Sequence, residues 1–397
     1  MPSRRQFMSA VAAGALGTVA GCTGSADEPP EATTPALDPE NHVSGADRNW
    51  SSFGGNAANT REVHDGQAPV DGVTERWRVA VPRSQYNEGT PVVADGRVYL
   101  PGEELRVFDA ADGTERWRAS GIRTAPVVRD GVVYGSDTAA EAVVALDADS
   151  GARLWTQPVD ARPRGPSMYP GDSLVVGVGE SVHALDPETG TRRWTEELFG
   201  TVLSHPPTNG ETVVVATTAG ELVLLDPRDG AGIARWRLPA PTATPPVVDV
   251  HDVYVNCEDG TTYAYRGRRG APGTARWSVD TGVASDGVTV ASGLVCAGTG
   301  SDLHAVDAES GDVQWTHDIG DWGATAPAVG RDTLFVGGDR LWALDPTSAG
   351  GRLTDSPGVR FERGFAGRVG PGPVLDDGTL YVVAETGPES EHLLALG

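Results

Sequence analysis

The chain has 397 residues, 55 of them acidic against 31 basic ones that are all arginine, and a formal net charge of −24. This excess of negative charge excludes a nucleic-acid-binding protein, because the phosphates would be repelled. A high content of Asp and Glu with no Lys is typical of proteins from salt-loving microbes, in which salt screens most of the repulsion between the carboxylates.

The first 21 residues have the pattern of an export signal. Arg4 and Arg5, followed by Phe7, resemble the twin-arginine motif that directs folded proteins across a membrane. The apolar stretch after them is too short for a transmembrane helix and ends at Gly21, just before Cys22. We therefore predict a twin-arginine lipoprotein signal over residues 1–21, with Cys22 as the lipidated residue. The alternative is an ordinary signal followed by an unrelated cysteine.

Residues 22–45 are rich in Pro, Thr, Asp and Glu and show no apolar period. This composition predicts a disordered acidic stalk between a membrane anchor and a folded domain at residues 46–397. The domain holds two further cysteines, Cys257 and Cys296. They form either a disulfide, which an exported protein tolerates, or two small buried apolar side chains.

A repeated hairpin organises the folded domain. In its intact form a short apolar strand ends at Asp186, a turn closes at Gly190, and the returning strand carries Trp194. Asp bonds to nearby backbone groups and Gly tolerates a positive φ, so both favour a tight turn. The hairpins begin at Val107, Ala145, Ala184, Leu224, Ala264, Ala305, Ala343 and Leu394. In the seventh, Phe361 replaces the tryptophan, and the eighth stops at the end of the chain.

Two further short strands precede each hairpin, so each unit holds four strands in about forty residues, the pattern of a β-propeller blade. The unit is rich in Val and interrupted by Gly and Pro, which disfavours a helical repeat. We therefore predict an all-β fold, an eight-bladed β-propeller of four-stranded blades. The strand at residues 74–79, which carries Trp77, should pair with residues 393–396 and close the ring between the chain ends.

The spacing Ala-x-Asp-x-x-x-Gly-x-x-x-Trp around Asp186 resembles the tryptophan-docking motif of the PQQ-like, quinoprotein-type propeller repeats. In that family the tryptophan stacks near the motif's glycine, and its indole N–H bonds to a carbonyl of a neighbouring blade. The resemblance implies this structural role for Trp77, Trp117, Trp155, Trp194, Trp236, Trp277 and Trp315. Residues 47–60 also resemble the segment that precedes the closing strand in such domains.

The family contains quinoprotein dehydrogenases, which hold PQQ and Ca²⁺ on the propeller axis, and non-enzymatic binding propellers such as the outer-membrane assembly lipoprotein. This chain has no adjacent cysteines, no long insertions between repeats and no Cys-x-x-Cys-His haem motif. The Asp-rich turns, such as Asp147 to Gly151, lack the distal Glu of a Ca²⁺ loop. We therefore expect a non-enzymatic protein without metal or cofactor, with a PQQ/Ca²⁺-dependent alcohol or sugar dehydrogenase as the alternative.

Residues that interrupt the repeat stand where the inner strands begin. In propellers these connecting loops gather at one mouth of the central channel. The predicted mouth residues are Arg83, Tyr86, Asn87, Arg123, Arg162, Arg164, His205, Trp322 and Arg368. Such a set suits an acidic or aromatic peptide or a glycan. The alternative is that these residues pack the funnel and pair with nearby Asp.

Together these patterns predict a monomeric scaffold, lipid-anchored on the extracytoplasmic face of the cell membrane, that binds a protein or glycan at the channel mouth. A surface glycan-binding protein is a second alternative to the scaffold.

Overall fold

The computed structural model describes residues 50–63, 66–82, 89–169, 173–250, 252–271, 273–320, 325–347 and 356–397. All of them belong to one compact unit, Pro39–Gly397. The predicted signal, the stalk and their residues Arg4, Arg5, Phe7 and Cys22 lie outside the described residues. All the regular secondary structure in the described part is β-strand, which confirms the predicted all-β class. Among these residues, none forms a helix long and apolar enough to cross a membrane.

Successive strands pair antiparallel within each sheet and run from the inner strand to the outer one. The inner strands are β3 (Val92–Ala94), β7 (Val127–Arg129), β11 (Ser167–Tyr169), β18 (Val247–Val248), β22 (Val288–Ala291), β26 (Ala328–Gly330) and β30 (Val374–Asp376). The second strands are β4 (Arg97–Leu100), β8 (Val132–Asp137), β12 (Ser173–Val178), β15 (Val213–Ala216), β19 (Asp252–Asn256), β23 (Leu294–Thr299), β27 (Thr333–Val336) and β31 (Thr379–Gly387).

The third strands are β5 (Glu104–Asp109), β9 (Ala142–Asp147), β13 (Ser181–Leu185), β16 (Glu221–Leu225), β20 (Thr261–Arg266), β24 (Asp302–Asp307), β28 (Gly338–Asp345) and β32 (Ser390–Leu396). The outer strands are β2 (Glu75–Val81), β6 (Glu115–Ser120), β10 (Arg153–Pro158), β14 (Arg192–Glu197), β17 (Gly232–Arg237), β21 (Trp277–Asp280), β25 (Val313–Asp318) and β29 (Gly358–Val369). One more short strand, β1 (Glu62–Val63), pairs in parallel with β26.

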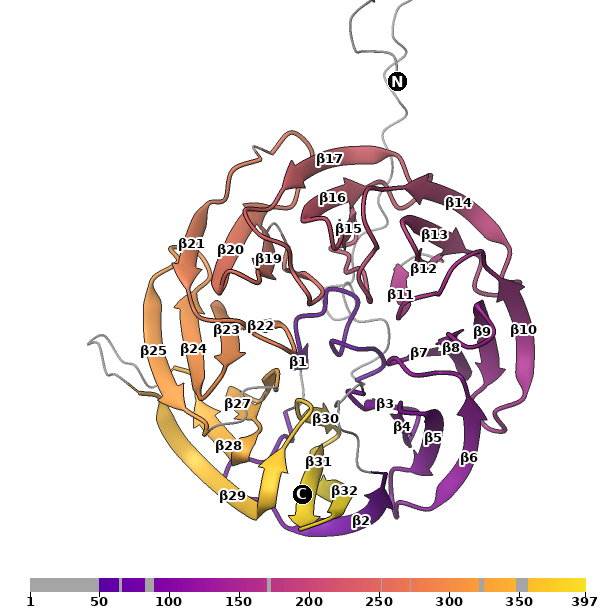
Figure 1. Cartoon of the computed structure of the whole chain (residues 1–397). Coiled ribbons are helices and arrows are strands. Elements are labelled where there is room, and N and C mark those ends of the chain that lie inside the picture. The colour runs from indigo at the N-terminus through magenta and orange to yellow at the C-terminus, as the bar shows by residue number, and fades with distance from the viewer. Residues whose placement is uncertain are drawn as a thin grey trace, which may run out of the picture. The chain divides into compact units, whose positions relative to one another are not determined.

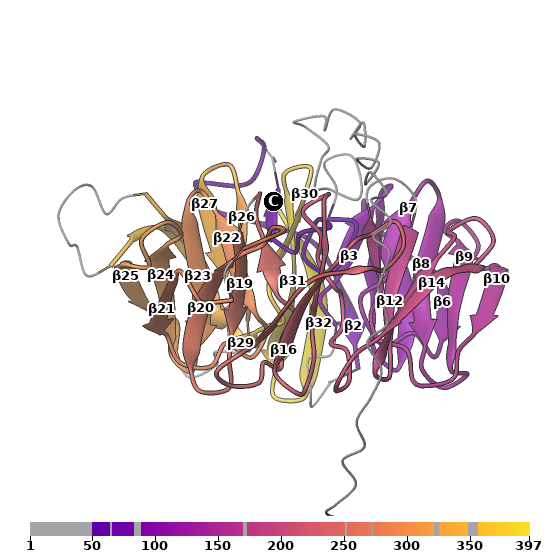
Figure 2. The ribbon, with the colours of Figure 1, turned by 90° about the horizontal axis from the view of Figure 1, so that it is seen from above.

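The sheets stand side by side around a common centre, with the outer strands on the periphery (Figure 1). In the view turned by 90°, the strands run between two faces, and turns lie at both (Figure 2). Five of the sheets within the described ranges have four strands, and the sheet β15–β16–β17 has three. In that sheet only an isolated bridge, Thr208 to Val213, marks the position of the inner strand.

The last two repeats share one nine-stranded sheet, where the sequence predicted two separate blades. The cause is β29, which has 12 residues, pairs with β28 along most of its length, and reaches β31 through Val369 and Ala384. The first and last long strands also meet in this sheet. Trp77 of β2 lies opposite Ala395 of β32 in an antiparallel pair.

The core lies between neighbouring sheets. Val92, Tyr99 and Val107 of one sheet pack against Val133 and Val144 of the next in a single buried cluster. Burial of β-branched and aromatic side chains on both faces stabilises the inner strands, which is why they read as short runs of valine. Each sheet therefore needs its neighbours to bury its faces.

The cysteines of the domain are free thiols in different clusters. Cys257 packs in the cluster of β16, β19 and β20, whereas Cys296 packs in that of β23, β24 and β27. Burial raises the pKa of both thiols to about 12, so they act as small apolar side chains.

Candidate functional site

Tryptophans of the outer strands join neighbouring sheets. Trp155 of β10 donates its indole N–H to the carbonyl of Pro187, at 2.9 Å, in the turn after β13. Its ring lies against Gly190, whose φ is +71° and where an added Cβ would come within 2.6 Å of the ring. The same bond to the next sheet is made by Trp77, Trp117, Trp194, Trp277 and Trp315. These side chains are contacts between sheets, so a functional site has to be sought elsewhere.

The Asp-rich turns use their carboxylates internally. Oδ1 of Asp147 accepts the backbone N–H and the hydroxyl of Ser150, at 2.8 and 2.6 Å. Asp307 accepts the backbone N–H groups of Glu309 and Ser310 in the same way. These hydrogen bonds hold the pKa of both carboxyls below the usual range. In the described part of the chain, no three His, Cys, Asp or Glu side chains gather as a metal site would require.

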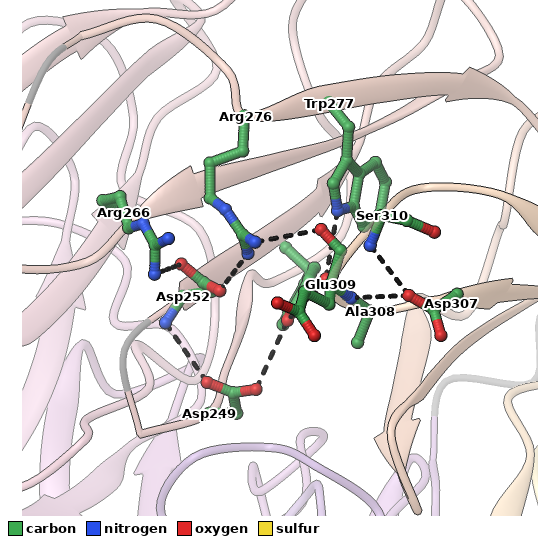
Figure 3. Close-up of polar contacts among 10 residues, drawn as sticks. Asp249, Asp252, Arg266, Arg276, Trp277, Asp307, Ala308, Glu309 and Ser310 are labelled. Atoms are coloured by element: carbon green, nitrogen blue, oxygen red, sulfur yellow. Dashed lines mark hydrogen bonds and ion pairs between the residues drawn. The ribbon is translucent and has the colours of Figure 1, made fainter.

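The sheet β18–β21 departs from the pattern, because Arg266 stands where other repeats carry Asp. Its cross-strand partner is Asp252, whereas the matching pair in the first sheet is Arg97 and Asp109. The two charges have thus exchanged strands. Asp252 pairs with Arg266 at 3.5 Å and also with Arg276, the residue before Trp277 (Figure 3).

The same cluster reaches the next sheet. Arg276 donates to the backbone carbonyl of Glu309 at 2.9 Å, and Trp277 donates to that of Ala308 at 3.0 Å (Figure 3). Tyr254, whose pKa is raised by burial and then by Asp249, lies 3.3 Å from that carboxylate. All these groups are engaged with one another, so the cluster is a structural tie between two sheets.

Residues 50–63, which we call the axial segment, wind around the centre of the sheets. Figure 1 shows β1, its last part, in the middle of the ring. Six inner-strand positions donate their backbone N–H to its carbonyls at 2.8–3.0 Å. The pairs, donor first, are Val93 to Trp50, Val128 to Ser51, Thr208 to Ala57, Val248 to Ala58, Val290 to Thr60 and Val329 to Arg61. Unpaired inner edges would leave buried donors unsatisfied, and the axial segment supplies their acceptors.

The side chains of Arg61 and His205 both stack on the ring of Phe53, which belongs to the axial segment. The guanidinium of Arg61 lies 4.7 Å from the centre of the Phe53 ring, and the imidazole of His205 stacks on the same ring at 4.4 Å. Burial lowers the pKa of Arg61 to about 10 and that of His205 to about 4. Asn59 donates to the carbonyl of His205 at 2.8 Å and so fixes its backbone. The centre is therefore a packed core.

The structure separates the predicted mouth residues. His205 is 4% exposed beneath Phe53. Arg368 is half-buried, with its Nε 3.3 Å from a carboxylate oxygen of Glu385. Arg123 is exposed and Arg164 half-buried, in the loops that precede β7 and β11. Arg83, Tyr86, Asn87 and Trp322 lie outside the described residues.

Sequence reasoning identified the axial segment as a leading stretch of the domain but missed its place on the axis. Its contacts with the inner strands are backbone hydrogen bonds, which leave no side-chain periodicity. The available signal is the density of small residues and Asn, with Asn59 at φ 61° and Gly55 packed on Trp50. Such residues permit the tight path that the segment follows.

Within the described ranges, the residues on the axis do not fit PQQ and Ca²⁺, which the resemblance would place there. The crevice beside Phe53, lined by Val127, Pro166, Met168 and His205, is too narrow for a water molecule. A polar tricyclic quinone needs several convergent polar side chains around an open space. Here the chain's own backbone occupies that space.

Comparisons with known proteins agree with this architecture. By fold, the chain is similar to the crystal structure of BamB from Moraxella catarrhalis, with a TM-score of 0.61, 15% identity, and coverage of 82% of this chain and 97% of that one. It is also similar to quinohemoprotein alcohol dehydrogenase from Comamonas testosteroni, with a TM-score of 0.71, 14% identity, and coverage of 88% and 80%. At these identities the likeness shows the fold alone.

A curated relative covers only a small part of the chain. Serine/threonine-protein kinase AfsK of Streptomyces coelicolor is 34% identical over 85 residues, which is 21% of this chain and 10% of the kinase. A family model of PQQ repeats, described as outer membrane protein assembly factor BamB, matches residues 69–198 and 178–396. These two matches span most of the sequence, and the chain therefore belongs to the PQQ-like repeat β-propeller family that this model describes.

Proposed function

We propose that the protein is a scaffold that binds other proteins on the extracytoplasmic face of the membrane. In this proposal residues 46–397 form an eight-bladed propeller closed by β2 and β32. Residues 22–45 are a stalk, and Cys22 carries the lipid anchor after twin-arginine export of the folded chain. The family description as an outer-membrane assembly factor supports a role in holding partners together.

The observation that carries the proposal is the filled axis. Six backbone hydrogen bonds hold the axial segment against the inner strands, at the place where an axial cofactor would sit. This leaves the loops at the two faces as the surfaces available to a ligand. A binding platform uses such loops directly, whereas a PQQ-dependent dehydrogenase needs an open axial site. The dehydrogenase and the glycan-binding protein remain the alternatives.

Membrane attachment is tested by Cys22→Ser, with Thr23→Ser as the matched control. We expect the wild-type protein and the control to sediment with membranes and to enter the detergent phase, because a lipid anchor supplies the attachment. Cys22→Ser should appear in the aqueous fraction. A Cys22→Ser protein that stays in the membrane fraction contradicts the anchor.

Partner binding is tested in intact cells with a photo-reactive amino acid at position 123 and, separately, at position 331. Position 331 lies in the turn at the opposite end of an inner strand. The scaffold predicts one recurrent protein adduct from position 123 and none from position 331. The absence of an adduct at position 123 would overturn the proposal, and so would alcohol oxidation by the purified protein supplied with PQQ and Ca²⁺.

A further inference from the structure

Three arginines lie together at one end of the inner strands. Arg123 precedes β7, and Arg162 and Arg164 precede β11. Isolated bridges pair Ile122 with Asp137 and Pro163 with Val178, at matching ends of β8 and β12. Arg123 and Arg164, which directly follow the bridged residues, therefore occupy equivalent positions in neighbouring sheets.

No acid in the described part of the chain forms an ion pair with any of these three guanidinium groups. Several arginines of the outer strands, by contrast, are held in ion pairs, as Arg116 is with Asp109 and Arg193 with Asp186. The guanidinium groups of Arg123, Arg162 and Arg164 are therefore available to pair with an external anion.

Arg164 is the most constrained of the three. Its side chain is half-buried, and burial, followed by the nearby charge of Arg162, lowers its pKa. A partly desolvated guanidinium next to a like charge raises the free energy of the unbound protein. An anion placed against both groups would remove this cost and add bidentate hydrogen bonds.

An exposed aromatic side chain stands in a loop next to the turn that residue 161 contacts. Phe199 is 61% exposed in the loop after β14. That loop is tied to the turn after β12, because Leu198 donates its N–H to the carbonyl of Glu180. An added Cβ on Gly179, in the same turn, would come within 3.0 Å of Ala161, next to Arg162. The loop that carries Phe199 and the loop that carries Arg162 thus flank the same turn.

We propose that Arg123, Arg162, Arg164 and Phe199, which we call the arginine rim, bind an acidic peptide segment of a partner protein. Carboxylates of the segment pair with the three guanidinium groups, and an apolar side chain packs on Phe199. Charge complementarity selects the partner, and the half-buried Arg164 makes the largest single contribution to binding among the three arginines. This inference rests on the proposed scaffold function and names the chemistry of its partner.

The test uses the whole protein and a short fluorescein-labelled peptide of alternating Glu and Leu, with a Gln and Leu peptide as control. We expect fluorescence anisotropy to show binding of the Glu peptide only. Arg164→Gln should weaken binding about tenfold, the effect of losing one charge-assisted contact. Arg123→Gln, at an exposed position that the fold does not need, should weaken it several-fold, and 1 M salt should weaken binding to all variants.

The matched control is Arg331→Asn, which removes an arginine at the far end of an inner strand. Position 331 has a φ of 47°, which Asn tolerates. Equal binding by Arg331→Asn and the double Arg123→Gln/Arg164→Gln variant would overturn the proposal. It would equally be overturned if polygalacturonate, but not the peptide, bound in an Arg164-dependent way. If the peptide fails while the photo-adduct at position 123 persists, the arginine rim is wrong and the scaffold stands; if both fail, both are wrong.

Discussion

At the scale of single residues, the burial and the pKa of His205 are set by a segment that lies far from it in sequence. It interrupts the repeat and so was predicted to line an open mouth. The structure places it under Phe53, with its Nδ1 3.0 Å from the carbonyl oxygen of Pro166. A buried imidazole in these surroundings stays neutral, which is why its pKa falls to about 4. The sequence shows that residue 205 is unusual, but not that residue 53 covers it.

This burial predicts a measurable dependence of stability on pH. The folded pKa of His205, about 4, lies below the unfolded value of 6.5, so the unfolded chain binds a proton that the folded one excludes. The stabilisation is complete above pH 6.5 and is lost as the pH falls towards 4, by about 3 kcal/mol in total. His205→Asn, which tolerates the φ of 53°, lacks this contribution. Urea unfolding of both proteins between pH 4 and 7 measures it, and parallel stability curves would contradict it.

At the scale of elements, the repeated hairpin could be read from sequence because its turn needs particular residues. Asp accepts backbone N–H groups, Gly adopts a positive φ, and Trp fills the gap to the next sheet. Pairing between strands was harder to predict. The exchange of Asp252 and Arg266 depends on which residues face each other across two strands. The length of β29 is permitted by residues 358–369, which contain no Pro, but shorter outer strands share that feature, so it could not be predicted from it.

The contact between sheets gives a second prediction, with a built-in control. Gly190→Ala places a Cβ 2.6 Å from the Trp155 ring at φ +71°, whereas Gly131→Ala, at φ +75°, meets nothing within 4 Å. Both changes should cost about 1 kcal/mol for the positive φ. Gly190→Ala should lose a further 1–3 kcal/mol or so, because the indole must move. Chemical denaturation compares the two, and equal losses would show that the tryptophan contact adds nothing.

At the scale of the whole molecule, the axial segment links sheets that are not neighbours as well as sheets that are. It bonds to β3 at one end and to β26 at the other, and on the way it satisfies donors in four further inner-strand positions. The sequence indicated the ring from its repeats but gave no indication of this link. Backbone hydrogen bonds can be made by any residue, so the sequence carries little trace of them.

Hydrogen exchange tests this link. The amides of Thr208 and Val248 should exchange only in rare openings, because Ala57 and Ala58 accept their hydrogen bonds. Asn59→Gly keeps the positive φ of 61° but removes the bonds from its side chain to the carbonyls of His205 and Pro246. Exchange at Thr208 and Val248 should then become about tenfold faster, with little change at Val93. Unchanged rates at both amides would show that the segment is held by other contacts.

The hydrogen bond between Arg61 and Val329 also constrains when the protein can complete its folding. The axial segment is made before the repeats, yet its last acceptor needs a donor from the seventh repeat, and β2 needs β32. Contacts so far apart in sequence make folding slow and postpone closure of the ring until β32 has been made. Under the export that we propose, such a chain has to finish folding as a whole before it crosses the membrane. An export route that accepts finished proteins, as the twin-arginine pattern at residues 1–21 predicts, would meet that need.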